Sequence, residues 1–390
     1  MKVLFWTSLV IVFYSYLGYG ILICLLVQLK RLFNNKKNDA SPFSRPPVSL
    51  VIAAFNEEEY IEQKLKNTLE IDYPPELLEI VVITDGSTDA TTMLVKKNYR
   101  VRLLHRPERR GKVAAMNRAI NYVSAPIVIF CDANTDLNPD CINAIVRHYN
   151  DPEVGAVAGE KIVTGKDGRA AGEGEGLYWK YESFLKRMDS EFYSTVGAAG
   201  ELFSIRTALF EKAPEDTIIE DFVQSLKVCI KGYVVRYEPR AFAAEGPSES
   251  IREEMKRKVR ITAGAFQAMG MLKELFNVFR FPVLSFQFIS HRILRWTLCP
   301  LSLVTLLISN IFLAFSSDGE FYHLFLIAQL VFYSLAITGW IFARQNIRLK
   351  FIFIPFYFSF MNVAVFLGFA RFVRKRQTVL WEKAARQKAR

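Results

Sequence analysis

Cysteine is scarce in this sequence, and its spacing argues against two kinds of site. The five cysteines form no C-x-x-C pair, so neither a disulfide framework nor a structural zinc site is expected. Such usage is typical of a reducing compartment. Glycine-rich phosphate loops of the G-x-G-x-x-G and Walker types are missing as well, which argues against dinucleotide-dependent dehydrogenases and P-loop enzymes.

Charge is absent from four long stretches, residues 3–29, 296–315, 321–343 and 351–370. Each is close to the roughly 20 residues that a helix needs to cross a bilayer core. The first is too long for the apolar core of a secretory signal and has no small-x-small cleavage site, so residues 1–37 are expected to form a retained transmembrane anchor. The other three are expected to form C-terminal transmembrane segments within residues 293–372.

The formal net charge of +11 lies beside these stretches. Residues 30–37 contribute four basic side chains and no acid, and residues 371–390 contribute eight basic side chains and one Glu, so the rest of the chain is formally neutral. Anionic headgroups and the positive-inside rule explain this placement. The expected partner of the excess charge is therefore a lipid bilayer, and no nucleic acid is needed.

The positive-inside rule also predicts the orientation of the chain. It places residues 30 to about 290 inside, the acidic loop with Asp318 and Glu320 outside, and the loop with Arg344 and Arg348 inside again. The expected protein is thus a multi-pass protein of the inner (plasma) membrane with a cytoplasmic domain.

The last apolar stretch conflicts with this orientation. A full crossing by residues 351–370 would leave the basic tail, residues 373–390, outside, whereas the rule predicts a cytoplasmic tail. We therefore expect this stretch, with Pro355 near its start, to be re-entrant or to lie in the membrane interface.

Residues 38–250 alternate short apolar runs with helical patterns, which is typical of a parallel sheet covered by helices. Strands are expected at 48–55, 79–84, 100–105, 125–131 and 155–158, and helices at 57–69, 88–97, 112–122 and 139–149. Asn138 is placed to cap the last of these helices. The predicted fold class is a doubly wound α/β domain, followed by amphipathic, interfacial helices at 251–292.

Polar side chains follow the expected strands. Asn56 and Glu57 come after the first strand, Asp85 after the second, and Asp132 and Asn134 after the fourth. Ligands of such sheets bind beyond the carboxyl ends of the strands, where a nucleotide and a divalent metal ion would lie. Asp132 is the expected ligand of Mg²⁺ or Mn²⁺ with Asn134 as a neutral second ligand, although a solvated loop is the alternative. Asp85 would face the base or ribose, unless it only serves the turn.

Two helix starts carry charged residues that suit transfer chemistry. Lys112, after Gly111, enters a helix whose N-terminal amides and ammonium group could hold donor oxygens. Asp221, after Glu220, is placed to take a proton from an acceptor hydroxyl, with Glu220 orienting the acceptor or raising the pKa of the base. The alternative for the acidic pair is a favourable interaction with the helix dipole alone.

Further candidates lie nearer to the apolar stretches. Arg257 and Arg260 share one face of an amphipathic helix, where they could bind a diphosphate leaving group or, alternatively, lipid headgroups. Trp179, Tyr181 and His291 could stack on or border a sugar acceptor, but packing at the interface explains them as well.

The ordered motifs PVSLVIAAFNEEEYI, VVITDGSTDAT, GKVAAMN, FCDANT, GAAGELFSIR and IIEDF resemble those of family 2 glycosyltransferases with a GT-A fold. The resemblance is to the membrane-integrated branch that includes cellulose, hyaluronan and poly-N-acetylglucosamine synthases, and it covers residues 48 to about 265. It implies an inverting transfer that forms a β-linkage from an α-linked donor, usually a UDP-sugar.

The resemblance also implies roles for individual residues. Donor binding falls to Ala54, Asn56, Glu57, Asp85 and Lys112, metal binding to Asp132, catalysis as base to Asp221, and the acceptor border to Gly197 and Gly200. Two positions depart from the family pattern. The D-x-D element reads Asp132-Ala133-Asn134, and the Trp of Q-x-x-R-W is replaced by Ile261 after Arg260.

Three functions therefore stay open at this point. The chain could extend a polysaccharide, transfer one sugar to a lipid-linked acceptor, or serve as a non-catalytic nucleotide-sugar sensor or scaffold among the subunits of a secretion complex. The acids at positions 132 and 221 favour an enzyme, because a non-catalytic domain has no chemical need for them.

Overall fold

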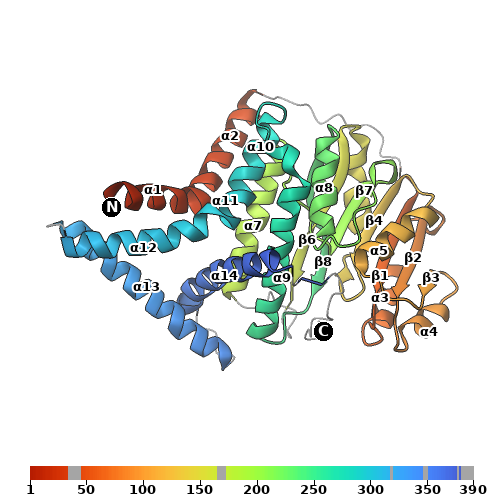
Figure 1. Ribbon diagram of the computed structural model, residues 1–390. Helices are drawn as coiled ribbons and strands as arrows, with labels where there is room; N and C mark the ends of the chain where they lie inside the picture. The colour runs from red at the N-terminus through yellow and green to blue at the C-terminus, as the bar shows by residue number, and fades with distance from the viewer. Residues whose placement is uncertain (34–44, 165–172, 317–318, 346–349, 376, 379–390) are drawn as a thin grey trace.

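The computed structural model describes residues 1–33, 45–164, 173–316, 319–345, 350–375 and 377–378. A large sheet with helices on both faces occupies one side of the molecule, and long apolar helices extend from the other side (Figure 1). Lys36, Lys37, Asp318 and Arg348, on which part of the orientation argument rests, and the tail at 379–390 lie outside the described residues.

The sheet is mixed and has eight strands. They are β1 (Val48–Ala54), β2 (Leu78–Asp85), β3 (Arg102–Arg106), β4 (Ile127–Asp132), β5 (Asp136–Leu137), β6 (Val154–Val163), β7 (Leu202–Arg206) and β8 (Val234–Glu245). Their order is β3-β2-β1-β4-β7-β6-β8-β5. The first four in this order are parallel, β7 runs antiparallel to both of its neighbours, and β6 and β8 are parallel.

The sequence predicted the parallel half of this sheet and the start of β6. It missed β5, β7 and β8, because these strands lack a long apolar run, and β8 in particular contains Pro239 and three charged residues before it ends at Glu245. The α/β class is confirmed, and the sheet is larger than expected.

Helices cover both faces of the sheet (Figure 1). One face carries α3 (Ile61–Leu69), α4 (Thr91–Lys96) and α6 (Cys141–Val146), and the other carries α5 (Lys112–Ala119), α8 (Glu220–Ile230), α9 (Ile251–Met271) and α10 (Pro282–Phe288). Alternate residues of β1 belong to the two cores: Leu50 and Ile52 pack on the first face, and Val51 and Ala53 on the second. This period of two is the side-chain alternation of a strand, and it explains why β1 is buried along its whole length.

The expected cap of α6 is wrong. Asn138 lies three residues before Cys141, the first residue of the helix, and its side chain bonds to β8: its amide nitrogen donates to Arg240 O (2.9 Å) and its amide oxygen accepts from Phe242 N (2.8 Å). Both bonds satisfy backbone groups of the sheet, and these groups compete with the helix amides for the same side chain.

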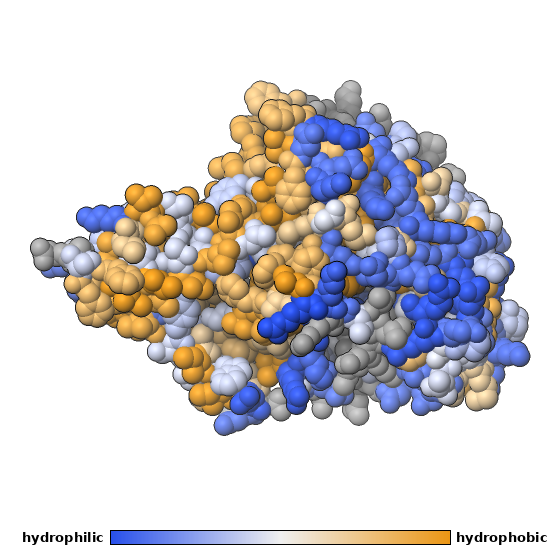
Figure 2. All heavy atoms as spheres, in the orientation of Figure 1, coloured by the Kyte–Doolittle hydropathy of each residue, from blue (hydrophilic) through white to orange (hydrophobic). Residues whose placement is uncertain are grey.

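Four described helical segments are long and apolar enough to cross a membrane by length and composition. They are Lys2–Phe33, Leu298–Ser316, Glu320–Arg344 and Phe351–Val373. The last three correspond to α12, α13 and α14 (Lys350–Val373). Figure 2 shows apolar residues gathered over this side of the molecule and polar residues over the sheet domain.

The N-terminal segment consists of α1 (Lys2–Phe13), a π-helical turn (Tyr14–Gly18) and α2 (Tyr19–Phe33). The chain changes direction at the turn (Figure 1). As a result, α1 packs along α12, whereas α2 packs along α7 (Glu173–Phe192) of the sheet domain.

The last helix, α14, lies against α9 of the sheet domain. Gly368 makes this approach possible, because a Cβ atom there would lie 2.6 Å from Thr262 Cβ. Residues 351–370 therefore contact both the sheet domain and α13. Whether they cross a bilayer or lie in its interface stays a prediction.

Glycine is required where α8 packs on β6. A Cβ atom on Gly155 would lie 2.4 Å from Val228 Cγ1 and 2.7 Å from Tyr233 Cβ, so Gly155→Ala should destabilise the protein by about 1–3 kcal/mol through overpacking. Gly270→Ala is the matched control, since nothing lies within 4 Å of its Cβ position and alanine favours the helix. Thermal unfolding of the purified protein in detergent should show a lower midpoint for the first variant only, and equal midpoints would contradict this packing.

Candidate active site

A cavity of about 730 Å³ opens beyond the carboxyl ends of β1 and β4. Ala53, Asp132 and Asn134 line it from the strand ends, Lys112 from the start of α5, and residues 217–222 from the loop and first turn of α8. The cavity continues past α7 and α9 to residues of the apolar helices, among them Tyr16 and Asn362. One cavity therefore connects the sheet to the helices that could cross a membrane.

Lys112 lies at the centre of the charged part of this cavity. Its Nζ atom is 2.8 Å from Asp132 Oδ1 and 3.1 Å from Glu220 Oε1. Gly111, with a φ of 100°, lets the chain turn into α5 so that the lysine enters the cavity. Burial alone would lower the pKa of Lys112, but the carboxylates of Asp132, Glu220 and Asp221 outweigh burial and raise it well above its usual range. The lysine is therefore a fixed cation.

Asp221 is next to this cluster, in the first turn of α8. A Cβ atom on Gly200 would lie 2.9 Å from Lys112 Nζ and 3.4 Å from Asp221 Oδ2, so the glycine borders both groups. Burial, followed by the neighbouring Glu220 carboxylate, raises the pKa of Asp221 to about 7. A carboxylate with this pKa suits a general base near neutral pH.

Gly197, the other glycine expected at the acceptor border, lies behind the expected base. Gly197 has a φ of 92°, and a Cβ atom there would lie 2.2 Å from Phe222 Cδ2. The ring of Phe222 is thus held directly against the backbone of Gly197, next to Asp221. Gly197 itself does not line the cavity.

The donor set beside Lys112 is suited to a hard divalent cation. Asp132 supplies a carboxylate that is 30% exposed to the cavity, and Asn134 lines the same wall with an amide oxygen. Mg²⁺ and Mn²⁺ prefer such oxygen ligands and commonly complete their shells with water and substrate phosphates. The described residues contain no group of three or more His, Cys, Asp or Glu side chains that could enclose a metal ion. A metal ion here would therefore be shared with a phosphate-bearing substrate.

Three of the expected donor-binding residues support the rim instead of lining the cavity. Asp85 is buried, and its Oδ2 atom accepts hydrogen bonds from Arg110 N (3.0 Å) and Gly111 N (2.6 Å), which fixes the loop that leads to Lys112. Asn56 adopts a φ of 53°, and its Oδ1 atom accepts from Thr88 N (2.8 Å). Ala54 is buried in the core, while its neighbour Ala53 lines the cavity. Direct donor contacts of these three residues stay predictions.

The remaining expected residues line the cavity. They are Glu57, Trp179, Arg257 and Arg260. Arg257 is held by Glu254, whose oxygens lie 3.1 Å from Nε and 3.2 Å from Nη2. Tyr181 does not line the cavity; its hydroxyl donates to Tyr16 O.

Trp179 lines the cavity, and its ring lies near two cations. Lys258 Nζ is 5.1 Å from the centre of its ring, and Lys161 Nζ is 5.5 Å away. Its indole N–H has no hydrogen-bond acceptor among the described residues. An aromatic ring that lines a cavity and has an unsatisfied N–H is suited to a sugar, whose hydroxyls accept hydrogen bonds and whose faces stack on aromatic rings.

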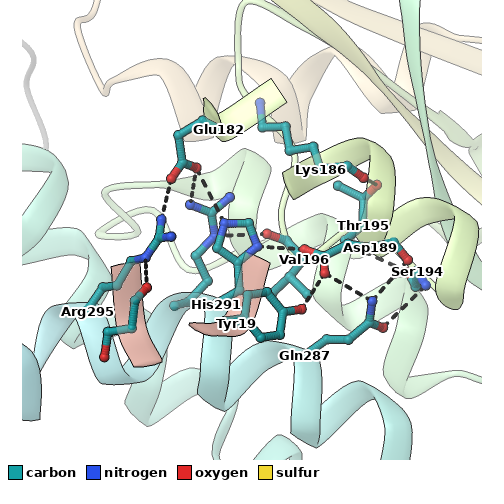
Figure 3. A network of polar contacts seen from close by, with 12 residues as sticks. Tyr19, Glu182, Lys186, Asp189, Ser194, Thr195, Val196, Gln287, His291 and Arg295 are labelled. Atoms are coloured by element: carbon teal, nitrogen blue, oxygen red, sulfur yellow. Dashed lines mark hydrogen bonds and ion pairs between the residues drawn. The ribbon is translucent and has the colours of Figure 1, made fainter. Parts of the chain in front are cut away.

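The far part of the cavity contains charged residues that the sequence did not single out (Figure 3). Glu182 on α7 is 3.1 Å from Arg292 Nη1 and 2.5 Å from Arg295 Nη1. Although burial opposes ionisation, Arg292, His291 and Arg295 hold the pKa of Glu182 well below its usual range. Lys186, one turn further along α7, lines the same cavity.

His291 is part of the support beneath this cluster. Its Nδ1 atom is 2.6 Å from Asp189 Oδ2, and Asp189 also accepts hydrogen bonds from Tyr19 and Gln287 (Figure 3). These side chains come from α7, α2 and the α10 region, so the bonds fasten the N-terminal segment to the sheet domain. The interface-packing interpretation of His291 is the one that these contacts favour. No spacing rule could have found the network, because its members are 98 to 170 residues apart.

Residues 49–213 match the family described as glycosyl transferase family 2, and this stretch, from β1 to just beyond β7, is a family 2 glycosyltransferase domain. The chain is 29% identical over 264 residues to the poly-beta-1,6-N-acetyl-D-glucosamine synthase of Staphylococcus aureus (strain COL), covering 64% of this chain and 62% of that protein. The synthase of Staphylococcus epidermidis is 28% identical over 234 residues, covering 57% and 55%. The chain thus spans less than two thirds of the length of these relatives.

A solved structure shows the same fold over nearly the whole chain. It is the mannosyltransferase PcManGT from Pyrobaculum calidifontis in complex with GDP-Man and Mn²⁺, with a TM-score of 0.71, 22% identity, and coverage of 96% of this chain and 100% of that chain. The GT-A fold and the added apolar helices expected from the sequence are therefore confirmed.

The raised pKa of Asp221 predicts a pH dependence. A base must be deprotonated to act, so the rate of any transfer that uses Asp221 should fall as the pH drops below about 7. In Glu220→Gln, removal of the adjacent negative charge should lower the pKa of Asp221. The pH below which the rate falls should therefore be lower in this variant. The measurement is kcat/KM for nucleotide release between pH 5.5 and about 8.5.

Glu215→Gln is the matched control, because Glu215 is exposed and pairs with Arg110 at 2.8 Å, away from the base. Its profile should coincide with that of the unmodified protein. If the rate of Glu220→Gln falls at the same pH as that of the unmodified protein, Glu220 does not raise the pKa of Asp221.

Proposed function

We propose that this chain, with its family 2 glycosyltransferase domain, is a membrane-bound inverting glycosyltransferase. It would move a sugar from a nucleotide diphosphate donor to a hydroxyl of a glycan or a lipid-linked acceptor. The observation that supports this proposal best is the position of Asp221 beside the Lys112 cluster, in a cavity that extends from the strand ends to the apolar helices.

The proposed reaction is a single displacement. The acceptor hydroxyl oxygen attacks the anomeric carbon, its proton passes to the Asp221 carboxylate, and the bond from the sugar to the diphosphate oxygen breaks on the opposite face. The nucleotide diphosphate leaves with the electron pair, and the configuration of the sugar is inverted. The neighbouring Glu220 carboxylate helps to raise the pKa of Asp221, so that Asp221 accepts the proton as the new bond forms.

Cationic groups would stabilise the departing diphosphate. Lys112 lies at the strand ends, and Arg257 and Arg260 line the cavity from α9. Asp132 and Asn134 would hold Mg²⁺ or Mn²⁺, and PcManGT, which shares the fold, was solved with Mn²⁺. When bound, such an ion neutralises charge that develops on the leaving group.

UDP-N-acetylglucosamine is the first donor to test, because the staphylococcal relatives are named synthases of an N-acetylglucosamine polymer. The donor would contact Glu57, which lines the cavity. Its site would also depend on Ala54, Asn56 and Asp85, which support the rim of the cavity. The apolar helices would hold the cavity at the cytoplasmic face of the inner membrane, as the basic residues next to them suggest. Further partners would be subunits of a secretion complex.

A non-catalytic nucleotide-sugar sensor is the alternative from another class, and one substitution separates it from an enzyme. Purified protein with UDP-N-acetylglucosamine and Mn²⁺ should release UDP, and Asp221→Asn should lower the rate by about 10²–10⁴-fold, the usual contribution of a general base. Donor binding, measured as thermal stabilisation, should persist in the variant. Absence of UDP release from the unmodified protein with any UDP- or GDP-sugar would support the sensor, and full activity of Asp221→Asn would disprove the base.

The size of the product separates polymer extension from a single transfer. Membranes that contain the protein should be incubated with radiolabelled UDP-N-acetylglucosamine, and the products extracted into organic solvent and resolved by size. We expect one labelled product in the organic phase, because Ile261 replaces the Trp of the processive synthases. A ladder of water-soluble products would show chain extension instead.

A further inference from the structure

The part of the cavity nearest the apolar helices has more basic than acidic side chains. Lys186, Arg292 and Arg295 line it, and Glu182 is the carboxylate that pairs with both arginines. His291, which also lines it, is paired with Asp189. The reaction proposed above uses none of these cations, since the donor and the base lie near Lys112.

Lys186 is buried without a partner of opposite charge. It is 6% exposed, and no described residue accepts a hydrogen bond or forms an ion pair with its ammonium group. The centre of the Tyr237 ring lies 5.7 Å from its Nζ atom. Three carboxylates, Glu160, Glu182 and Glu201, attract it through space without an ion pair, and Glu160 also accepts a hydrogen bond from Ser183 Oγ at 2.7 Å. In Figure 3, no dashed contact reaches the lysine ammonium.

Arg295 also has an unused donor. Its Nε atom donates to Ser15 O (2.9 Å) and its Nη1 atom to Glu182, but its buried Nη2 has no acceptor among the described residues. A buried cation without an ion pair and an unsatisfied buried N–H each cost free energy, which an anion that binds both would recover. These two groups therefore indicate a missing anionic ligand.

The surroundings indicate what the anion is attached to. Trp296, Met361 and Val365, from α11 (Leu294–Trp296) and α14, line the same cavity and give it an apolar side. Arginine and lysine together favour phosphate, whose oxygens accept several charged hydrogen bonds. A phosphate joined to an apolar chain fits both features.

The spacing along α7 gives the order of the groups. Trp179, Glu182 and Lys186 are three and four residues apart, so they follow one face of the helix, and all three line the cavity. Trp179 is suited to a sugar, and Lys186 to a phosphate one or two turns further on. Because Asp221 would remove a proton from a hydroxyl, the phosphate is a group that binds and not the atom that reacts.

We propose that Lys186 and Arg295 bind the phosphate of a lipid-linked sugar acceptor, whose sugar reaches Asp221 past Trp179 and whose lipid chain leaves beside Trp296. The acceptor role rests on the proposed function, whereas the phosphate site can be tested without any transfer reaction.

Binding of farnesyl phosphate, farnesol and inorganic phosphate to the purified full-length protein in detergent tests this site. Lys186→Met should weaken farnesyl phosphate binding by about tenfold or more, since it removes a charged hydrogen bond, and Lys186→Arg should restore it. Lys180→Met is the matched control on the exposed side of the same helix and should leave the affinity unchanged. Farnesol should bind at least about tenfold more weakly than farnesyl phosphate and should not respond to Lys186→Met.

Other results would overturn the proposal. Equal affinities for farnesol and farnesyl phosphate, or unchanged binding in Lys186→Met, would show that no anion site exists. Inorganic phosphate that binds as tightly as farnesyl phosphate would show a site for free phosphate and not for a lipid. Loss of stabilisation by UDP-N-acetylglucosamine with Mn²⁺ in Lys186→Met would assign the lysine to the donor.

Two controls separate this site from folding and from catalysis. Lys186→Met should unfold at about the same temperature as the unmodified protein, because the substitution breaks no ion pair between described residues and leaves an apolar side chain of similar length. Asp221→Asn should bind farnesyl phosphate normally even when no transfer occurs. The phosphate site can therefore be disproved without disproving the proposed reaction, and the reverse also holds. Loss of farnesyl phosphate binding in Asp221→Asn would show that the phosphate site and the base are not independent.

Discussion

Charge that is removed from water must be compensated within the protein, since the effective penalty for an unpaired buried ion is several kcal/mol. Around this cavity the compensating groups belong to different elements. Lys112 of α5 holds Asp132 at the end of β4 and Glu220 at the start of α8. These ion pairs therefore fix the positions of the elements relative to one another, and the geometry of the site depends on them.

The same constraint acts between the sheet domain and the apolar helices. Glu182 of α7 holds Arg292 and Arg295, which lie just before α12, and Asp189 of α7 holds Tyr19 of α2 and His291. The N-terminal segment and the segment that leads into α12 thus meet on a single helix of the sheet domain. Lys186 is different, because it lies near these pairs and forms no ion pair with a described residue.

Much of the fold and part of the site could be predicted from the sequence. The strands β1, β2 and β4 are largely apolar, and β2 and β4 end at Asp85 and Asp132, so Asp132 could be placed at the carboxyl end of the sheet before any coordinates. Lys112 and Asp221 could be found because each begins a helix with a recognisable local pattern. The match to glycosyl transferase family 2 includes the helix that begins at Lys112, but it ends at residue 213, before Asp221.

The rest depends on contacts that no local pattern encodes. Arg295 and Glu182 are 113 residues apart, and their contact follows from the packing of α7 against the helices before α12. Asp85 follows a strand as expected, yet the amides of Arg110 and Gly111 occupy its carboxylate, and only the loop geometry reveals this. Asn138 could cap α6 or bond to the backbone of β8, and it does the latter. The sequence could not show this, because β8 itself was not predicted.

The π-helical turn at Tyr14–Gly18 has a consequence for the whole molecule. Its carbonyl groups at Ser15 and Tyr16 accept hydrogen bonds from Arg295 and Tyr181, two side chains that belong to the cavity region and to α7. The angle between the first helix and the sheet is therefore set from inside the protein. If the first helix is embedded in lipid, the catalytic cleft cannot rotate freely over the bilayer, and every copy of the enzyme presents the cleft to the surface at the same tilt.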